Sequence, residues 1–321
     1  MNPAAPQVCV TVGEEIAAYG FPHHHPFGTF RHDAFWQEAQ RRGLDRRVQV
    51  LSPVMATPEE LHRFHTPEYV DRVRALSLTG TGLLDRGDTP AFVGVYEAAS
   101  FVVGSALDLM RRMMRGECRR AFIPIAGLHH AQPSTAGGFC VFNDCGVVIH
   151  SVRQEFGLKR IAYVDIDAHH GDGVFYAFES DPELIFADIH EDGHFLYPGT
   201  GHAYEEGLGA AKGRKLNIPA PMGADDRFFH REWPRVEALL TKFAPEFILL
   251  QCGADSVAGD PLTHMGFSPE AHGHAAERLS VIAESLGHGR VLAVGGGGYD
   301  PVNIAQAWCA VVEGLLKVPG P

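Results

Sequence analysis

The sequence predicts an α/β protein in which a mostly parallel sheet is flanked by helices. Short apolar runs alternate with longer amphipathic segments along the 321 residues, which is typical of strand–helix–strand units. Long Gly-, Pro- and His-rich segments directly follow several strand candidates, at the end where parallel sheets build their sites. No repeat or low-complexity linker divides the chain, so we expect a single domain spanning residues 1–321.

Strands are expected where four to six consecutive residues are mainly apolar, as in FILLQC. These segments are Val8–Val12, Val48–Leu51, Ala121–Ile125, Ile161–Asp165, Leu184–Asp188, Phe247–Cys252 and Val291–Val294. Amphipathic periodicity predicts helices at Asp33–Arg42, Pro67–Ser77, Phe92–Arg115, Asn143–Phe156, Asp226–Phe243, Pro269–Leu286 and Pro301–Leu316. Thr57 and Ser268 precede Pro-Glu and have the pattern of a helix N-cap followed by a first-turn proline.

Composition limits the partners that this chain can have. Lys and Arg total 27 against 39 Asp and Glu, a formal net charge of −12, which disfavours a nucleic-acid-binding surface. The paired arginines, including Arg111-Arg112 and Arg119-Arg120, are expected on solvated faces or at helix C-termini. Six cysteines without a CxxC pair indicate buried free thiols. The start MNPAAPQVCVTV lacks a signal-peptide pattern and no apolar run approaches 18 residues, so a cytoplasmic protein without a membrane span is expected.

The segment AYVDIDAHHGDG, residues 162–173, places three carboxylates and two histidines at a strand end. If the extended backbone continues, Asp167 and His169 fall in register and can reach one divalent ion such as Zn²⁺. A third protein ligand must come from another loop. Asp255, in FILLQCGADSVAGDP, is the best candidate, although an aspartate there is also a common helix N-cap. Two aspartates and one histidine suit a catalytic, exchangeable metal rather than a structural one.

The segment GLHHAQPSTAGGFCVFND presents two adjacent imidazoles, His129 and His130. An imidazole becomes a directional base when a carboxylate fixes its tautomer. Asp165 and Asp172 remain after the metal ligands are assigned, so two His–Asp pairs beside one metal are the favoured interpretation. An isolated histidine pair would otherwise be interpreted as part of a loop cap.

The segment AVGGGGYDP places Tyr299 after four glycines at the end of the last expected strand. Glycines allow close backbone approach and positive φ angles. Phosphate binding would require a GxxxxGK[ST] pattern or a GxGxxG run before a helix, and neither accompanies these glycines. A phenol held on such a loop can hydrogen-bond a substrate carbonyl.

Taken in order, HHA…GFCVFND, VDIDAHHGDG, PGTG, GADSVAGDP and GGGGYD resemble the zinc-dependent histone deacetylase superfamily, which includes acetoin-utilisation and acetylpolyamine amidohydrolase branches. The resemblance runs from about Gly20 to near the C-terminus. It implies the arginase–deacetylase fold, with a central eight-stranded parallel sheet flanked by helices. It also implies a zinc-dependent amidohydrolase that removes acetyl or other acyl groups from lysine side chains.

The resemblance implies roles for individual residues. The matched zinc ligands are Asp167, His169 and Asp255. His130, paired with Asp172, matches the general base and acid; His129, paired with Asp165, matches the histidine that stabilises the transition state; and Tyr299 matches the tyrosine that polarises the acyl carbonyl. The matched substrate-binding residues are Gly138 and Phe139 in the tunnel, Tyr197 as the opposite wall, and Asp88 at the rim.

A structural K⁺ is also implied, around Asp165, Asp167, His169, Asp188 and Ile189. Asp188 departs from the family pattern, because many relatives have a small hydroxyl residue there. The loop His23-His24-His25 borders the tunnel mouth in relatives, and we expect it to be an exposed, non-catalytic loop rather than an added zinc site.

Leu262 bears on the substrate. Polyamine-specific members have an acidic residue at this position, after GDP, whereas leucine cannot attract a second ammonium group. Acylated lysine in a peptide or protein is therefore the first choice, and small acylated amines such as acetylpolyamines are the second. An arginase-type di-manganese enzyme is disfavoured by HHGDG after DID and by Tyr299. A non-catalytic acyl-lysine-binding protein is disfavoured because every matched catalytic position is intact. Oligomerisation remains possible.

Overall fold

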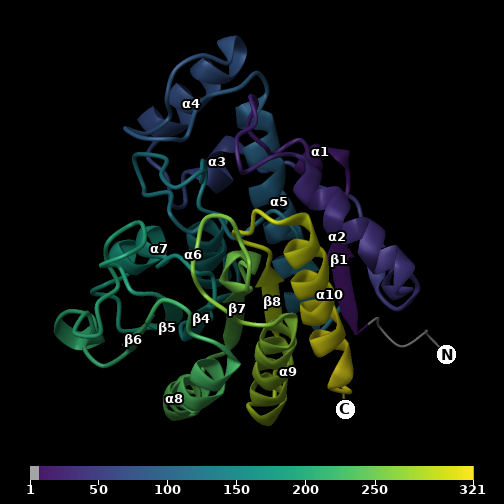
Figure 1. Ribbon diagram of the computed structural model, residues 1–321, viewed down its shortest axis with the longest axis vertical. Coiled ribbons are helices and arrows are strands. Elements are labelled where there is room, and N and C mark those ends of the chain that lie inside the picture. Colours follow the sequence, from purple (N-terminus) through teal and green to yellow (C-terminus); the bar gives the residue numbers. More distant parts are fainter. Residues whose placement is uncertain (1–6, 321) are drawn as a thin grey trace.

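A computed structural model describes residues 7–320, and one eight-stranded sheet runs through them (Figure 1). Neighbouring strands are all parallel, in the order β2-β1-β3-β8-β7-β4-β5-β6. The α/β class and the eight-stranded parallel sheet are thus confirmed. The strands are β1 Val8–Thr11, β2 Gln49–Leu51, β3 Arg120–Ile123, β4 Ile161–Asp165, β5 Leu184–Glu191, β6 Lys215–Ala220, β7 Phe247–Gln251 and β8 Val291–Val294.

Helices cover both faces of this sheet. In Figure 1, α2, α10 and α9 lie side by side along one face, while α5 and α6 pack together along the other. The helices are α1 Glu14–Ala17, α2 Phe30–Arg41, α3 Pro58–Leu61, α4 Pro67–Thr79, α5 Val95–Met114, α6 Asp144–Phe156, α7 Asp172–Ala177, α8 Asp226–Phe243, α9 Pro269–Ser285 and α10 Pro301–Lys317. Over the described part of the chain, none of them combines the length and apolar character of a membrane span. Residues 1–6, on which part of the signal-peptide expectation rests, lie outside the described residues.

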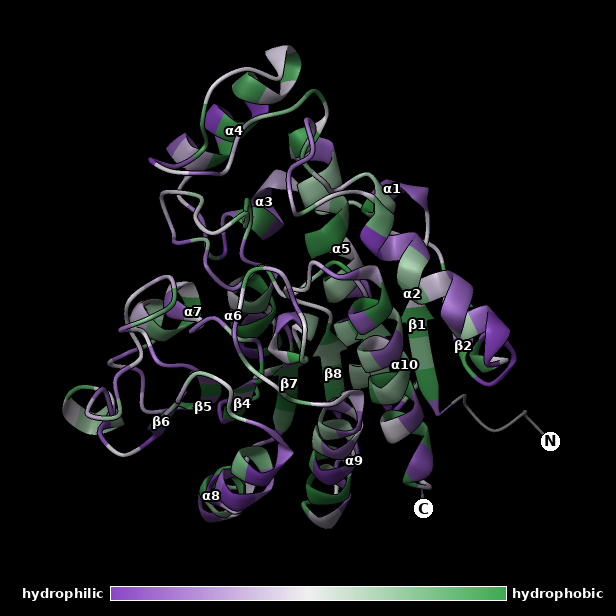
Figure 2. Cartoon of the chain, viewed as in Figure 1, coloured by the Kyte–Doolittle hydropathy of each residue, from purple (hydrophilic) through white to green (hydrophobic). Residues whose placement is uncertain are grey.

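Most strand residues are apolar because helices shield both faces of the sheet, and the polar residues lie mainly toward the strand ends. Every residue of β1, β3, β4, β5, β7 and β8 is buried. Figure 2 shows this directly, with hydrophobic strands such as β1 and β8 behind helices whose outer faces are polar. The six cysteines are buried and free, as expected.

Strand β6 was not expected from the sequence, because KLNIPA contains Lys, Asn and Pro and lacks an apolar run. It lies at the edge of the sheet, where a proline is tolerated because one side of the strand has no neighbour. The ammonium group of buried Lys215 is compensated there, since it donates to the carbonyl of Asp181 at 2.8 Å and to that of Leu184 at 2.5 Å.

The expectation that the paired arginines are solvated was wrong for Arg120. This residue lies in β3 and is fully buried. Its guanidinium donates to the carbonyls of Leu315 at 3.0 Å and Val318 at 2.6 Å and pairs with Glu284 at 2.5 Å. Arg120 therefore ties the centre of the sheet to α9 and to the end of α10.

The sheet order brings the ends of β3, β8, β7 and β4 together, because these four strands are consecutive neighbours. The loops that follow them converge at the carboxyl ends of the strands. Trp308 of α10 contacts two of these loops. Its buried indole N–H donates to the carbonyl of Cys252 at 3.2 Å and to that of Gly295 at 3.1 Å. The tryptophan thereby holds together the backbones that follow β7 and β8.

Replacing Trp308 by phenylalanine should lower the free energy of unfolding by about 2 kcal/mol, because two buried carbonyls lose their donor and a small void is left. Denaturant titration followed by far-ultraviolet circular dichroism measures this change. Trp36→Phe is the matched control, since Trp36 is only half-buried on α2 and should show a smaller loss. Equal losses for the two variants would contradict the proposed support of the loops.

Candidate active site

Buried carboxylates and histidines meet at the end of β4. Asp165, the last residue of this strand, accepts hydrogen bonds from the backbone N–H of Asp167 at 3.0 Å and from the Tyr163 hydroxyl at 2.5 Å. Burial, together with the charges of Asp188 and Asp167, raises the pKa of Asp165 well above its ordinary range. The chain has thus placed several carboxylates in one poorly solvated region, which requires compensation by donors or cations.

Asp167, His169 and Asp255 form a three-donor cluster, with ligand atoms within 4.8 Å of one another. Nδ1 of His169 lies 3.1 Å from Oδ1 of Asp167 and 3.1 Å from Oδ2 of Asp255. Although burial acts in the opposite direction, the two carboxylates raise the pKa of His169 to about 10. The cluster therefore favours positive charge, and its spacing suits one ion with metal–ligand distances of about 2.0–2.2 Å.

Each of the paired histidines contacts its own carboxylate. Nδ1 of His129 lies 2.8 Å from Oδ2 of Asp165, and Nδ1 of His130 lies 2.6 Å from Oδ1 of Asp172. The two Nε2 atoms are 3.1 Å apart and face the same space. Burial and the neighbouring His129 lower the pKa of His130 to about 4, so this imidazole is neutral at pH 7 and can accept a proton.

Two buried polar residues that the sequence did not single out hold these loops in place. Asp144, at the start of α6, accepts the backbone N–H groups of Gly127 at 2.9 Å and Leu128 at 2.8 Å, just before the paired histidines. Gln251, at the end of β7, donates to Oδ2 of Asp167 at 2.8 Å. Polar residues at element ends are the available sequence signal, but their partners lie far away along the chain.

The glycine loop after β8 brings the backbone against the donor cluster and carries Tyr299. The N–H of Gly297 donates to Oδ2 of Asp167 at 2.8 Å, and the buried Arg31 guanidinium donates to the carbonyl of Gly298 at 2.8 Å. Asp260 accepts the N–H of Tyr299 at 2.9 Å. Burial and the charges of nearby aspartates raise the pKa of Tyr299 well above its ordinary value, so its hydroxyl remains a donor.

A cavity of about 210 Å³ leads from the surface to these groups. It is lined by Asp88, His130, Gly138, Phe139, His169, Leu196, Tyr197, Leu262 and Tyr299. All five residues expected to bind substrate therefore lie on this cavity. A Cβ atom at Gly138 would lie 2.4 Å from Cδ2 of His130, so glycine is required where this wall passes the histidine.

The triple-histidine loop divides between solvent and the cavity wall. His23 and His24 are exposed, as expected. His25 instead packs edge-on against Phe139, with ring centroids 4.4 Å apart, and its Nε2 lies 3.2 Å from the carbonyl of Asp88. His25 thus supports one wall and the rim of the cavity.

Asp188 is buried beside the same cluster, and both of its oxygens have partners in the protein. Oδ2 accepts the N–H of Gly171 at 2.9 Å, and Oδ1 lies 2.7 Å from Nδ1 of His190. The departure from a small hydroxyl residue is thus accompanied by a local Asp188–His190 pair. Potassium binding around this residue stays a prediction.

Fold and site together define an α/β protein of the arginase–deacetylase type. Residues 25–315 match the family model described as the histone deacetylase domain. The chain is 34% identical over 309 residues to the acetoin utilization protein AcuC of Bacillus subtilis (strain 168), covering 91% of this chain and 78% of AcuC. It is 32% identical over 313 residues to the histone deacetylase RPD3 of Saccharomyces cerevisiae, covering 94% of this chain and 70% of RPD3.

A solved structure agrees with these sequence matches. The HDA15 HD domain superposes with a TM-score of 0.89 at 27% identity, covering 98% of this chain and 89% of that one. The chain belongs to the histone deacetylase family, and it is a deacetylase by this relationship.

Asp260 holds the backbone N–H of Tyr299 with one oxygen and that of Leu262 with the other, each at 2.9 Å, so Asp260→Ala should release the tyrosine and lower kcat about 10- to 100-fold with a smaller change in KM. Steady-state deacetylation measures both constants. Asp260→Asn, whose amide oxygen can accept the same N–H, should recover part of the rate.

Asp300→Ala is the matched control for Asp260→Ala. Asp300 adjoins Tyr299 but caps α10, accepting the N–H groups of Val302 at 2.8 Å and Asn303 at 3.0 Å. It should cost about 1 kcal/mol of stability with a much smaller loss of kcat. Equal losses of kcat in the Asp260→Ala and Asp300→Ala variants would rule out a positioning role for Asp260.

Proposed function

We propose that this protein is a zinc-dependent amidohydrolase that removes acetyl or other acyl groups from lysine side chains. The observation that carries the proposal is the convergence at one cavity of a three-donor cluster, two His–Asp pairs and a partly buried tyrosine. Each component is common, but their combination supplies a metal site, a base and an oxyanion donor within one small space.

The residues present fit a zinc ion at Asp167, His169 and Asp255. Three protein donors with room for further ligands are typical of catalytic zinc sites. The glycine loop packs directly against these carboxylates. A Cβ atom at Gly297 would lie 2.1 Å from Oδ2 of Asp255 and 2.9 Å from Oδ2 of Asp167, so only glycine fits beside them. When bound, zinc lowers the pKa of a water ligand and withdraws electrons from an amide carbonyl.

His130 is assigned the proton transfers. Its Nδ1–H is held by Asp172, which leaves Nε2 as an acceptor facing the cavity. There it takes a proton from the attacking water and later gives it to the leaving amine nitrogen. The carboxylic acid formed then gives its proton to the amine, so the products are the acylate and the lysine ammonium. His129, held by Asp165, supports this transfer electrostatically from the adjacent position.

Tyr299 is assigned to the carbonyl oxygen. Its hydroxyl lines the cavity together with His130 and His169, and its pKa is held high by burial, so it donates a hydrogen bond as negative charge develops on that oxygen. Asp260 and Arg31 fix the loop from which it projects.

The substrate is proposed to be acylated lysine in a peptide or protein. Phe139 and Tyr197 present aromatic walls suited to the methylene chain of lysine, and Asp88 stands at the rim, where it can accept substrate amide N–H groups. Small acylated amines are the second candidate. Leu262 at the mouth offers no charge for a distal ammonium group, which favours the peptide over an acetylpolyamine.

Tyr299→Phe should lower kcat about 100- to 1,000-fold, because one oxyanion donor is lost while the metal donors remain. A fluorogenic acetyl-lysine peptide measures turnover, and elemental analysis measures bound zinc. Tyr204→Phe is the control, since this tyrosine is exposed and is not among the residues lining the cavity. Turnover by the Tyr299 variant at the unmodified rate would refute the role given to the hydroxyl.

A substrate panel separates the two candidates. Peptides carrying acetyl-lysine or longer acyl-lysines should have higher kcat/KM than acetylated polyamines, and Leu262→Glu should shift the ratio toward the polyamines by adding a charge for the second ammonium group. A preference of the unmodified protein for an acetylpolyamine would overturn the argument from Leu262. Absence of chelator-sensitive hydrolysis across the panel, in zinc-loaded protein, would overturn the enzymatic proposal.

A further inference from the structure

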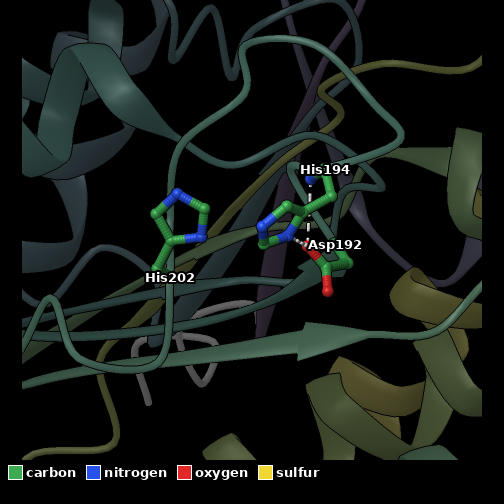
Figure 3. A group of neighbouring side chains, drawn as sticks. All are labelled: Asp192, His194 and His202. Carbon is green, nitrogen blue, oxygen red and sulfur yellow. Dashed lines mark hydrogen bonds and ion pairs between the residues drawn. The ribbon is translucent and has the colours of Figure 1, made fainter.

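A second group of potential metal ligands lies outside the tunnel, on the loop that follows β5. Asp192, His194 and His202 bring their ligand atoms within 4.8 Å of one another (Figure 3). Nδ1 of His194 lies 2.6 Å from Oδ1 of Asp192, and the two imidazole centroids are 5.1 Å apart at an angle of 56°. Figure 3 shows the two rings next to each other, with the carboxylate beside His194.

Both imidazoles are oriented by neighbours other than each other. The ring of His202 stacks on Tyr204, with centroids 5.1 Å apart at 18°, and its backbone N–H donates to Oε2 of Glu205 at 2.6 Å. Asp192 fixes His194 twice, by accepting its backbone N–H at 3.0 Å and by contacting its ring.

The backbone brings the two ends of the loop that carries these groups close together. A Cβ atom at Gly193 would lie 2.6 Å from the carbonyl oxygen of Thr200, so the chain passes itself at close range near both ends of the loop. The two histidines, eight positions apart in the sequence, are therefore adjacent without any movement of the loop. Such preorganisation removes much of the entropic cost of forming a site.

We propose that Asp192, His194 and His202 form a second zinc-binding site, separate from the tunnel. Two imidazoles and one carboxylate are ligands that Zn²⁺ prefers, whereas Mg²⁺ and Ca²⁺ prefer sites made of oxygen atoms. The His194 side chain is 69% exposed and that of Asp192 is 31% exposed, so water completes the coordination and the ion exchanges readily.

The position of the site gives zinc binding a structural consequence. Leu196 and Tyr197, which line the tunnel cavity, lie on the same loop between His194 and His202. An ion joining the two ends would restrict the motion of this wall. The inference goes beyond the proposed hydrolysis, because it concerns different ligands and holds whether or not the tunnel binds zinc.

Zinc binding to the purified full chain tests the proposal. Equilibrium dialysis with elemental analysis should find a second, weaker zinc equivalent in addition to that of the tunnel. His194→Ala and His202→Ala should each weaken this second equivalent by about tenfold or more, while Asp255→Asn should affect only the tunnel. His62→Ala is the matched control, an exposed histidine at the end of α3 that should leave both equivalents unchanged.

Hydrogen exchange provides a readout that does not depend on activity. Added zinc should slow amide exchange in residues 193–201 of the unmodified protein and not in the His202→Ala variant. The proposal is overturned if the second equivalent is absent, if it persists at full affinity in both histidine variants, or if Mg²⁺ displaces it at equal concentration. Either of the first two results would leave the Asp192–His194 contact as an ordinary hydrogen bond of a loop, and the third would exclude a site selective for zinc.

Discussion

Buried negative charge at the end of β4 is the constraint on which the rest of the site depends. Asp165, Asp167, Asp188 and Asp255 are all fully buried. An isolated carboxylate in such surroundings costs several kcal/mol, so the charges persist only where donors, imidazoles or a cation compensate them. The histidines that contact these carboxylates, His129, His169 and His190, supply part of this compensation, and His129 and His169 also belong to the groups suited to amide hydrolysis.

The compensation is distributed along loops that are far apart in the sequence. Asp167 accepts hydrogen bonds from Gln251, the last residue of β7, and from Gly297 in the loop after β8, each at 2.8 Å. Asp255 accepts the N–H of Ala168 at 2.9 Å. The parallel strand order makes these contacts possible, because β8, β7 and β4 are consecutive neighbours whose carboxyl ends point in the same direction.

The features that could be predicted from the sequence were those determined by short segments of it. Apolar runs located seven of the eight strands, and polar residues at strand ends located the donors of the cluster. Residues whose environment depends on distant parts of the chain escaped prediction. Arg120 resembles a surface arginine until α9 and α10 enclose it, and Asp144 resembles a helix-end aspartate until the histidine loop folds over it. Strand β6 escaped because an edge strand tolerates the Lys, Asn and Pro that disrupt an apolar pattern.

The two donor clusters differ in burial, and this difference would give a bound ion different effects at each. Asp167, His169 and Asp255 lie in a buried region of low dielectric constant, where charges interact strongly and a bound ion would act on a group that enters the tunnel. Asp192 and His194 lie in water, where the same interactions are screened. An ion in the exposed cluster would polarise an amide bond only weakly. Its effect would be confined to the backbone that it joins, and that backbone carries the tunnel wall at Leu196 and Tyr197.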